Sequence, residues 1–195
     1  MADIIPRWEW RTFGESFGDA DQRFKSLAPR DVEESDEVYL LSPTVDANVK
    51  IRNRLMDIKA LQQGNADGLE QWKPVMKGSF PLSSADVGKV FEALHVTTPP
   101  LARASYTEDQ LLDELVKPAG QVRTVAVHKK RTRYRIDDCA AEMTEVAANG
   151  KNVRTLAIES EDPSSVIAAV RGLGLGRFEN VSYPRGLKRL VGMAT

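Results

Sequence analysis

Eight short segments of the chain carry the alternating pattern of a half-buried β-strand, and they are spread over nearly its whole length. In the first segment, residues 6–13, Trp8 and Trp10 alternate with Arg7, Glu9 and Arg11. Such alternation places the aromatic side chains on one face and the charged side chains on the other. The remaining segments are residues 37–41, two strands within 48–61, then 69–77, 121–134, 139–147 and 153–160. Eight strands and a few helices predict one α+β domain over residues 1–195, whose antiparallel sheet curls or closes into a barrel.

The segment 48–61 is expected to form a hairpin with a tight turn at Asn53-Arg54. A two-residue turn would place Lys50 and Arg52 on the same face as Asp57 and Lys59. In 69–77, Pro74 indicates an edge position or a bulge, because proline cannot donate to a strand ladder. Helical periodicity predicts helices over residues 16–27, 85–94, 107–116 and 164–173, with one further turn at 186–191.

Charged residues are sorted between the strands, although their sum is close to zero. The chain has 27 Lys and Arg against 28 Asp and Glu, which gives a formal net charge of -1. This balance excludes a broad basic surface for nucleic acid. Residues 121–135 nevertheless hold six basic side chains and no acidic one, whereas residues 137–162 hold seven acidic side chains and two basic ones. Either these charges pair across a solvated sheet face, at about 0.2–1 kcal/mol for each pair, or they face one cavity.

The same alternation of charged residues recurs on several strands, and this repetition favours the interpretation that the charges face one cavity. Alternate charged residues recur on four strands, as Lys50/Arg52, Lys59, Lys129/Arg131 and Glu159/Glu161. Basic side chains match phosphate oxygens, and carboxylates are preferred ligands of hard divalent cations such as Mg²⁺ or Mn²⁺. The pattern therefore predicts a polyanion site that also holds a divalent cation.

Six segments, in this order along the chain, resemble the CYTH family of triphosphate tunnel metalloenzymes, which includes class IV adenylate cyclases and thiamine triphosphatases. The segments are EVYLLSP, NVKIRNRLMDIKAL, VAVHKKRTRY, AEMTEV, LAIESED and VSYPRGLKRL. The resemblance implies a tunnel of eight antiparallel strands with helices packed outside. It also implies that Lys50, Arg52, Lys59, Lys129 and Arg131 bind phosphate and that Glu145, Glu159 and Glu161 hold the metal.

The family's N-terminal signature, Glu-x-Glu-x-Lys, would fall on Arg7-x-Glu9-x-Arg11, with Glu9 and Arg11 at its catalytic positions. This chain departs from the signature, because a cation replaces the first carboxylate and arginine replaces the lysine. Arginine stays charged and accepts protons poorly. We expect Arg7, Glu9 and Arg11 to point into the tunnel beside Glu159 and Glu161 if the altered signature is real.

Other motifs are set aside. Gly172-Leu173-Gly174-Leu175-Gly176 follows a predicted helix rather than a strand, so it indicates a helix end and a turn instead of a dinucleotide site. The single cysteine, Cys139, excludes an internal disulfide. With no signal-peptide pattern and no apolar run of about 20 residues, we expect a cytoplasmic protein without membrane contact.

Three functions remain open from the sequence. The first is a divalent-metal-dependent phosphohydrolase that acts on an inorganic or organic triphosphate bound inside the charged tunnel. The second is a nucleotidyl cyclase, and the third is a non-catalytic module that binds polyphosphate or a nucleotide. The cations Arg7 and Arg11 favour the third, because they stand where a metal ligand and a lysine were expected. The expected partner is a triphosphate or polyphosphate small molecule, and a homodimer is one oligomeric state that the sequence allows.

Overall fold

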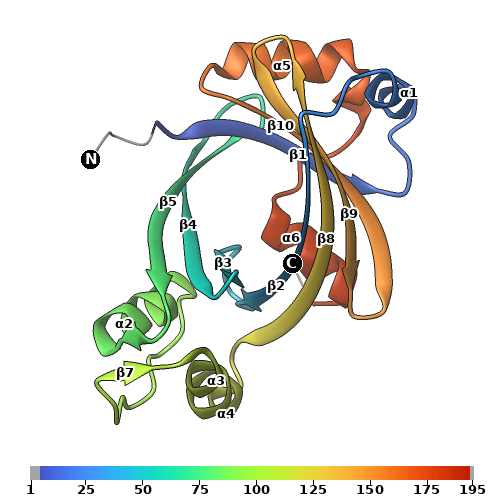
Figure 1. Cartoon of the computed structure of the whole chain (residues 1–195). Coiled ribbons are helices and arrows are strands. Elements are labelled where there is room, and N and C mark those ends of the chain that lie inside the picture. Colours follow the sequence, from blue (N-terminus) through green and yellow to red (C-terminus); the bar gives the residue numbers. More distant parts are fainter. Residues whose placement is uncertain (1–4, 194–195) are drawn as a thin grey trace.

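Eight antiparallel strands close into a barrel, so the predicted fold class is confirmed (Figure 1). The computed structural model describes residues 5–193. Around the barrel the order is β1-β10-β9-β8-β2-β3-β4-β5, and β5 returns to pair with β1. The strands are β1 (Arg7–Gly14), β2 (Asp31–Leu41), β3 (Asn48–Arg52), β4 (Leu55–Gly64), β5 (Glu70–Ser79), β8 (Arg123–Ile136), β9 (Cys139–Ala148) and β10 (Lys151–Ser160).

The hairpin of β3 and β4 forms as predicted. Asn53 and Arg54 both have positive φ, at 51° and 59°, which is the conformation of a type I′ turn. Lys50 pairs with Asp57 across the hairpin. Pro74 lies at a register shift between β4 and β5, which confirms the bulge.

Strand β2 begins at Asp31, six residues before the expected start at residue 37. Its first half is rich in aspartate and glutamate, which have low β-propensity, and propensity therefore argued against a strand. The structure pairs this half with the basic strand β8, where Asp31 lies opposite Arg133 and Glu33 opposite Arg131. Ion pairs between the acidic side chains of β2 and the basic side chains of β8 therefore stabilise a strand that β-propensity alone would not favour.

Two layers of helix cover the outside of the barrel. On one side, α2 (Ser84–Ala93) is capped by Ser83 and packs on the apolar face of β3 and β4. It is joined by the two-residue pair β6 (Leu82–Ser83) and β7 (Ser105–Tyr106), and by a helical segment of α3 (Glu108–Gln110), a π-helix (Leu111–Val116) and α4 (Lys117–Ala119).

On the other side, α5 (Pro163–Gly172) and α1 (Asp19–Lys25) cover the face of β1, β9 and β10 that carries Trp10 and Ile158 (Figure 1). Helix α1 is shorter than expected, because Gly18 directly before it has a φ of 63°. The glycine-rich stretch after α5 forms the predicted helix end, followed by a 3₁₀ turn at Leu175–Arg177.

Helix α6 (Tyr183–Val191) lies on the inner side of the barrel, unlike the helices outside. The sequence predicted only a turn at 186–191. Leu187 packs against Val125 and Val127, which share a face of β8 with Lys129. A Cβ atom on Gly186 would lie 2.3–2.5 Å from ring atoms of Phe13, so glycine permits this close approach. Helix α6 therefore fills one part of the interior with apolar contacts and leaves the rest polar.

No helix among residues 5–193 has the length and apolar character needed to cross a membrane.

Candidate functional site

A cavity of about 440 Å³ lies inside the barrel and is called the tunnel cavity below. All five phosphate-binding candidates line it, namely Lys50, Arg52, Lys59, Lys129 and Arg131. Three further cations, Arg11, Arg30 and Arg133, bring the basic side chains in its wall to eight. Its acidic side chains are Glu9, Asp31, Asp57, Glu142 and Glu159. The wall therefore has three more cations than carboxylates and suits an anion.

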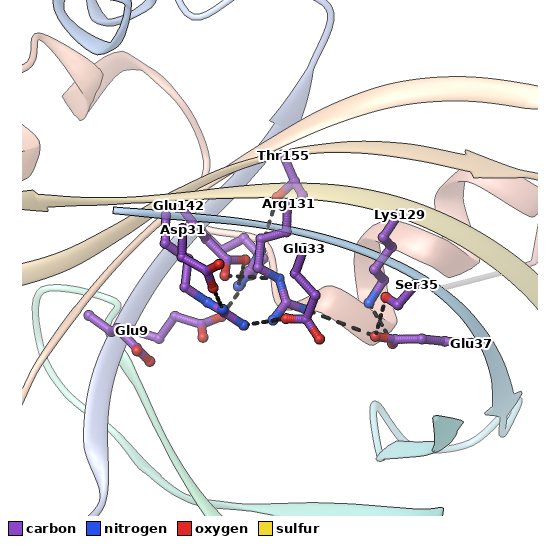
Figure 2. A network of polar contacts seen from close by, with 12 residues as sticks. Glu9, Asp31, Glu33, Ser35, Glu37, Lys129, Arg131, Glu142 and Thr155 are labelled. Carbon is purple, nitrogen blue, oxygen red and sulfur yellow. Dashed lines mark hydrogen bonds and ion pairs between the residues drawn. The ribbon is translucent and has the colours of Figure 1, made fainter. Parts of the chain in front are cut away.

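Glu37 on β2 organises the basic side chains and is itself only 2% exposed. Its carboxylate accepts a hydrogen bond from Lys129 Nζ at 2.7 Å (Figure 2). It accepts a second one from Lys50 Nζ at 3.1 Å. Two guanidinium groups lie farther out, Arg52 at 3.8 Å and Arg131 at 3.9 Å. Burial alone would raise the pKa of Glu37, but the charges of Lys129 and Lys50 outweigh it and lower that pKa to about 2. Glu37 is therefore a permanent anion that holds these cations in place.

Lys129 is 1% exposed and lies between two aromatic rings. Its Nζ donates to the hydroxyl of Tyr39 at 2.7 Å and lies 3.9 Å from the ring centroid of Tyr183 on α6. The rings of Tyr39 and Tyr183 stack, with centroids 5.5 Å apart. Burial, together with the charge of Lys50, holds the pKa of Lys129 well below its ordinary value. Helix α6 thus supplies part of an aromatic floor beneath the cations.

A second cluster of charges joins β1, β8 and β9. Arg11 donates from Nε to Glu9 Oε1 at 2.8 Å, and its Nη2 lies 2.9 Å from Glu142 Oε1. Glu142 Oε2 lies 3.4 Å from Nε of Arg131 (Figure 2). Thr155 Oγ1 lies 3.3 Å from Arg11 Nη1. Burial raises the pKa of Glu142, but Arg11 and Arg131 overcome that effect and lower the pKa to about 2.

Two residues of the altered N-terminal signature, Glu9 and Arg11, face this interior. Glu9 and Arg11 line the tunnel cavity, and Arg7 Nη1 lies 3.1 Å from Glu159 Oε1. Glu9 and Glu159 are directly opposite each other on β1 and β10. Burial and then the negative charge of Glu9 raise the pKa of Glu159, while Arg7 and Lys59 act in the opposite direction.

Two of the predicted metal ligands, Glu145 and Glu161, do not line the tunnel cavity, and the structure places Glu145 away from Glu159. Glu145 is exposed on β9 and lines a separate outer groove with His128 and Arg154. It lies three residues from Glu142, and an odd spacing on a strand places two side chains on opposite faces. Glu161 follows the last residue of β10 and is exposed, so strand alternation no longer fixes its direction.

Sequence reasoning missed the two carboxylates that hold the cations, Glu37 and Glu142, and the stacked tyrosines, Tyr39 and Tyr183. Glu142 stood in the acidic run, but the choice of Glu145 selected the wrong face. For Glu37 the available signal was the acidic run before it, which is the natural partner of the basic segment 121–135.

The described residues suit a divalent cation only in part. Within residues 5–193 no three His, Cys, Asp or Glu side chains are placed to hold a metal ion. Glu9 and Glu159 are the adjacent pair of carboxylates, and each uses Oε1 to contact an arginine. Mg²⁺ is commonly held by one or two carboxylates together with substrate phosphates and water, and this donor pair fits that arrangement.

Comparisons with known proteins give a fold and no close relative. No family model and no curated protein sequence matches this chain. Among solved structures, a candidate adenylyl cyclase from Hippeastrum, described as having a dominant triphosphatase activity, is 12% identical with a TM-score of 0.53, and the match covers 97% of each chain. A candidate adenylate cyclase from Bacillus halodurans is 11% identical, over 95% of this chain and 98% of that one, with a TM-score of 0.49. The likeness to the Hippeastrum protein shows a shared fold.

Proposed function

We propose that this barrel, which has the tunnel fold implied by the CYTH resemblance, binds the triphosphate group of a small molecule and hydrolyses one of its phosphoanhydride bonds. The observation that carries the proposal is the convergence of eight basic side chains on one cavity of about 440 Å³. Triphosphates carry several negative charges in a short chain, and charge-assisted hydrogen bonds from arginine and lysine match their oxygens.

The cations have different tasks in this proposal. Lys50 and Lys129 form ion pairs with Glu37, so they contribute to the positive potential of the tunnel cavity without contacting the ligand directly. Arg52 lies 3.8 Å from Glu37, beyond hydrogen-bond distance, and is free to turn toward a ligand. Among the described residues no ion pair involves Lys59. We therefore assign the direct phosphate contacts to Arg52 and Lys59, with Arg131 beside them.

The reaction adds water to a phosphorus atom and breaks its bond to the bridging oxygen, so that tripolyphosphate gives orthophosphate and diphosphate. Fixed cations stabilise the negative charge that the phosphoryl oxygens carry in the transition state. A bound Mg²⁺ or Mn²⁺ would add charge neutralisation at the phosphates. Glu9 and Glu159 are the residues that would hold it and would orient the attacking water.

The test is phosphate release from tripolyphosphate, ATP and thiamine triphosphate with Mg²⁺ or Mn²⁺. We expect Glu159→Gln and Lys59→Met to lower the rate by about a hundred- to a thousandfold, the range for one lost electrostatic contact to a transition state. Glu145→Gln is the matched control, because this carboxylate lies on the neighbouring strand and points outward. Absence of release with every substrate and both cations would contradict hydrolysis.

A second candidate, a non-catalytic binding module, is favoured by the ion pairs of Arg7 with Glu159 and Arg11 with Glu9. These pairs neutralise carboxylates without a metal. Tight binding of tripolyphosphate in the presence of a chelator, with no turnover, would support this candidate. A ligand at 100 times its Kd adds about 2.7 kcal/mol of stability, which thermal unfolding detects. With ATP, formation of diphosphate together with a cyclic nucleotide would indicate a nucleotidyl cyclase instead.

A further inference from the structure

We propose that Arg7 is an internal counter-ion that competes with a divalent cation for Glu159, so that this chain binds free metal weakly. The inference rests on the proposed function and specifies how the metal requirement of the tunnel cavity is set. It concerns a half-exposed arginine at the start of β1, which contacts one of the two carboxylates that would hold the metal.

The contact between Arg7 and Glu159 follows from the pairing of β1 with β10. Glu9 lies directly opposite Glu159 in the register, and Arg7 precedes Glu9 by two residues, so it shares the same face of β1. From this position Arg7 Nη1 reaches Glu159 Oε1 at 3.1 Å. The guanidinium therefore occupies one oxygen, Oε1, of the Glu159 carboxylate.

Arg7 differs from the other arginine on this face in how firmly it is held. Arg11 contacts Glu9, Glu142 and Thr155, and its side chain is 7% exposed. In contrast, the side chain of Arg7 is 51% exposed and that of Glu159 is 38% exposed. Exposed pairs of this kind contribute about 0–1 kcal/mol, so a competing cation can displace Arg7 but not Arg11.

The surroundings of Glu159 favour a cation at this place. The residues that act on its charge are Glu9 and Glu142, which repel it, and Arg7 and Lys59, which attract it. Glu9 lies directly opposite Glu159 in the strand register, so two carboxylates stand side by side at this place. A divalent cation that binds Glu159 must break the contact with Arg7 and then lie near its positive charge. Without Arg7, metal binding would neither break an ion pair nor bring the cation near a positive charge.

The experiment measures binding of Mn²⁺ alone to the full chain, without any phosphate compound, from the electron paramagnetic resonance signal of free Mn²⁺. We expect Arg7→Gln to bind Mn²⁺ about three- to tenfold more tightly than the wild type, the range for losing one half-exposed ion pair and one repelling charge. Arg103→Gln is the matched control, because Arg103 forms an equally exposed pair with Glu114 far from the cavity. Its Kd should stay within about twofold of the wild-type value. Glu159→Gln in the Arg7→Gln background should remove the gain.

An unchanged or weaker affinity in Arg7→Gln would overturn the inference, and so would an equal gain in Arg103→Gln. Absence of Mn²⁺ binding in both the wild type and Arg7→Gln would also overturn it. Should Arg7→Gln fail to fold, Arg7→Met repeats the measurement, since methionine keeps an unbranched apolar stem. Phosphate release by the wild type tests the proposed function separately, so hydrolysis with an unchanged Mn²⁺ affinity would leave that function standing and refute the role of Arg7 alone.

Discussion

Replacing Glu37 by glutamine should destabilise the barrel more than any exposed charge substitution. Glu37 is 2% exposed, and its two nearest cations, Lys129 and Lys50, are 1% and 7% exposed. The substitution leaves two buried ammonium groups without their carboxylate. Breaking a buried ion pair from one side costs about 3–5 kcal/mol, because the remaining charge is desolvated and unpaired. We expect a loss of that size in the free energy of unfolding near pH 7.

The pH dependence gives an independent value for the same contribution. The pKa of Glu37 falls from its ordinary 4.5 to about 2 in the folded barrel. At 1.36 kcal/mol for each pKa unit, this shift corresponds to about 3 kcal/mol. Because the folded pKa is the lower one, the contribution is fully present above pH 4.5 and is lost as the pH falls through about 2. The difference between wild type and Glu37→Gln should therefore shrink by about 3 kcal/mol over this interval.

Urea unfolding of both proteins between pH 7 and pH 2, followed by circular dichroism, measures this difference. Glu142 also has a pKa of about 2, so it contributes to acid unfolding in both proteins and cancels in the comparison. Glu34→Gln is the control, because Glu34 lies on the same strand with an exposed side chain paired to His128. It should change stability by less than about 1 kcal/mol. A loss in Glu37→Gln no larger than in the control, or one that does not vary with pH, would refute the reasoning.

Three further predictions concern α6, the buried lysine and the ligand. Gly186→Ala should cost about 1–3 kcal/mol in urea unfolding, because its Cβ would overlap the Phe13 ring, whereas Gly88→Ala, with open space around it, should stabilise α2 by about 0.5–1 kcal/mol. An equal effect at both positions would contradict the placement of α6. Tyr39→Phe removes one of the two hydrogen-bond acceptors of Lys129, the other being Glu37, and should cost about 1.5–3 kcal/mol; thermal unfolding no different from wild type would contradict the contribution of that hydrogen bond. Tripolyphosphate affinity, followed by calorimetry, should fall steadily with added salt, and a salt-independent Kd would argue against binding by the cations of the wall.

Strand number and strand faces could be predicted because they depend on local alternation. The face of Lys50 and Arg52 followed from a turn of two residues, and the structure has that turn. The same reasoning failed for Glu145, where choosing one acidic residue over another three positions away selected the opposite face of β9. For Glu161 the alternation gives no direction, because β10 ends at the preceding residue.

Helix α6 and the acidic half of β2 show a different kind of limit. The sequence of α6 indicates a turn or a short helix. No local sequence pattern predicts that Tyr183 and Leu187 lie inside the barrel. The interior wall that receives Leu187, with Val125 and Val127, exists only after the strands have closed. Likewise, the first residues of β2 become a strand only beside β8, so their local propensity is a poor guide.

By itself, the sequence determined the eight strands of the barrel and the alternation of charged residues toward one side of several of them. The tertiary structure decided which carboxylate neutralises which cation. Glu37 and Lys129 are 92 residues apart, and they meet because β2 and β8 become neighbours with one particular register. Register in a closed barrel is set by all of its strands together, and a shift of one residue would turn every charge of a strand outward. The sequence alone therefore shows which residues are charged and how they alternate. Which of them pair with one another is decided only when the barrel closes.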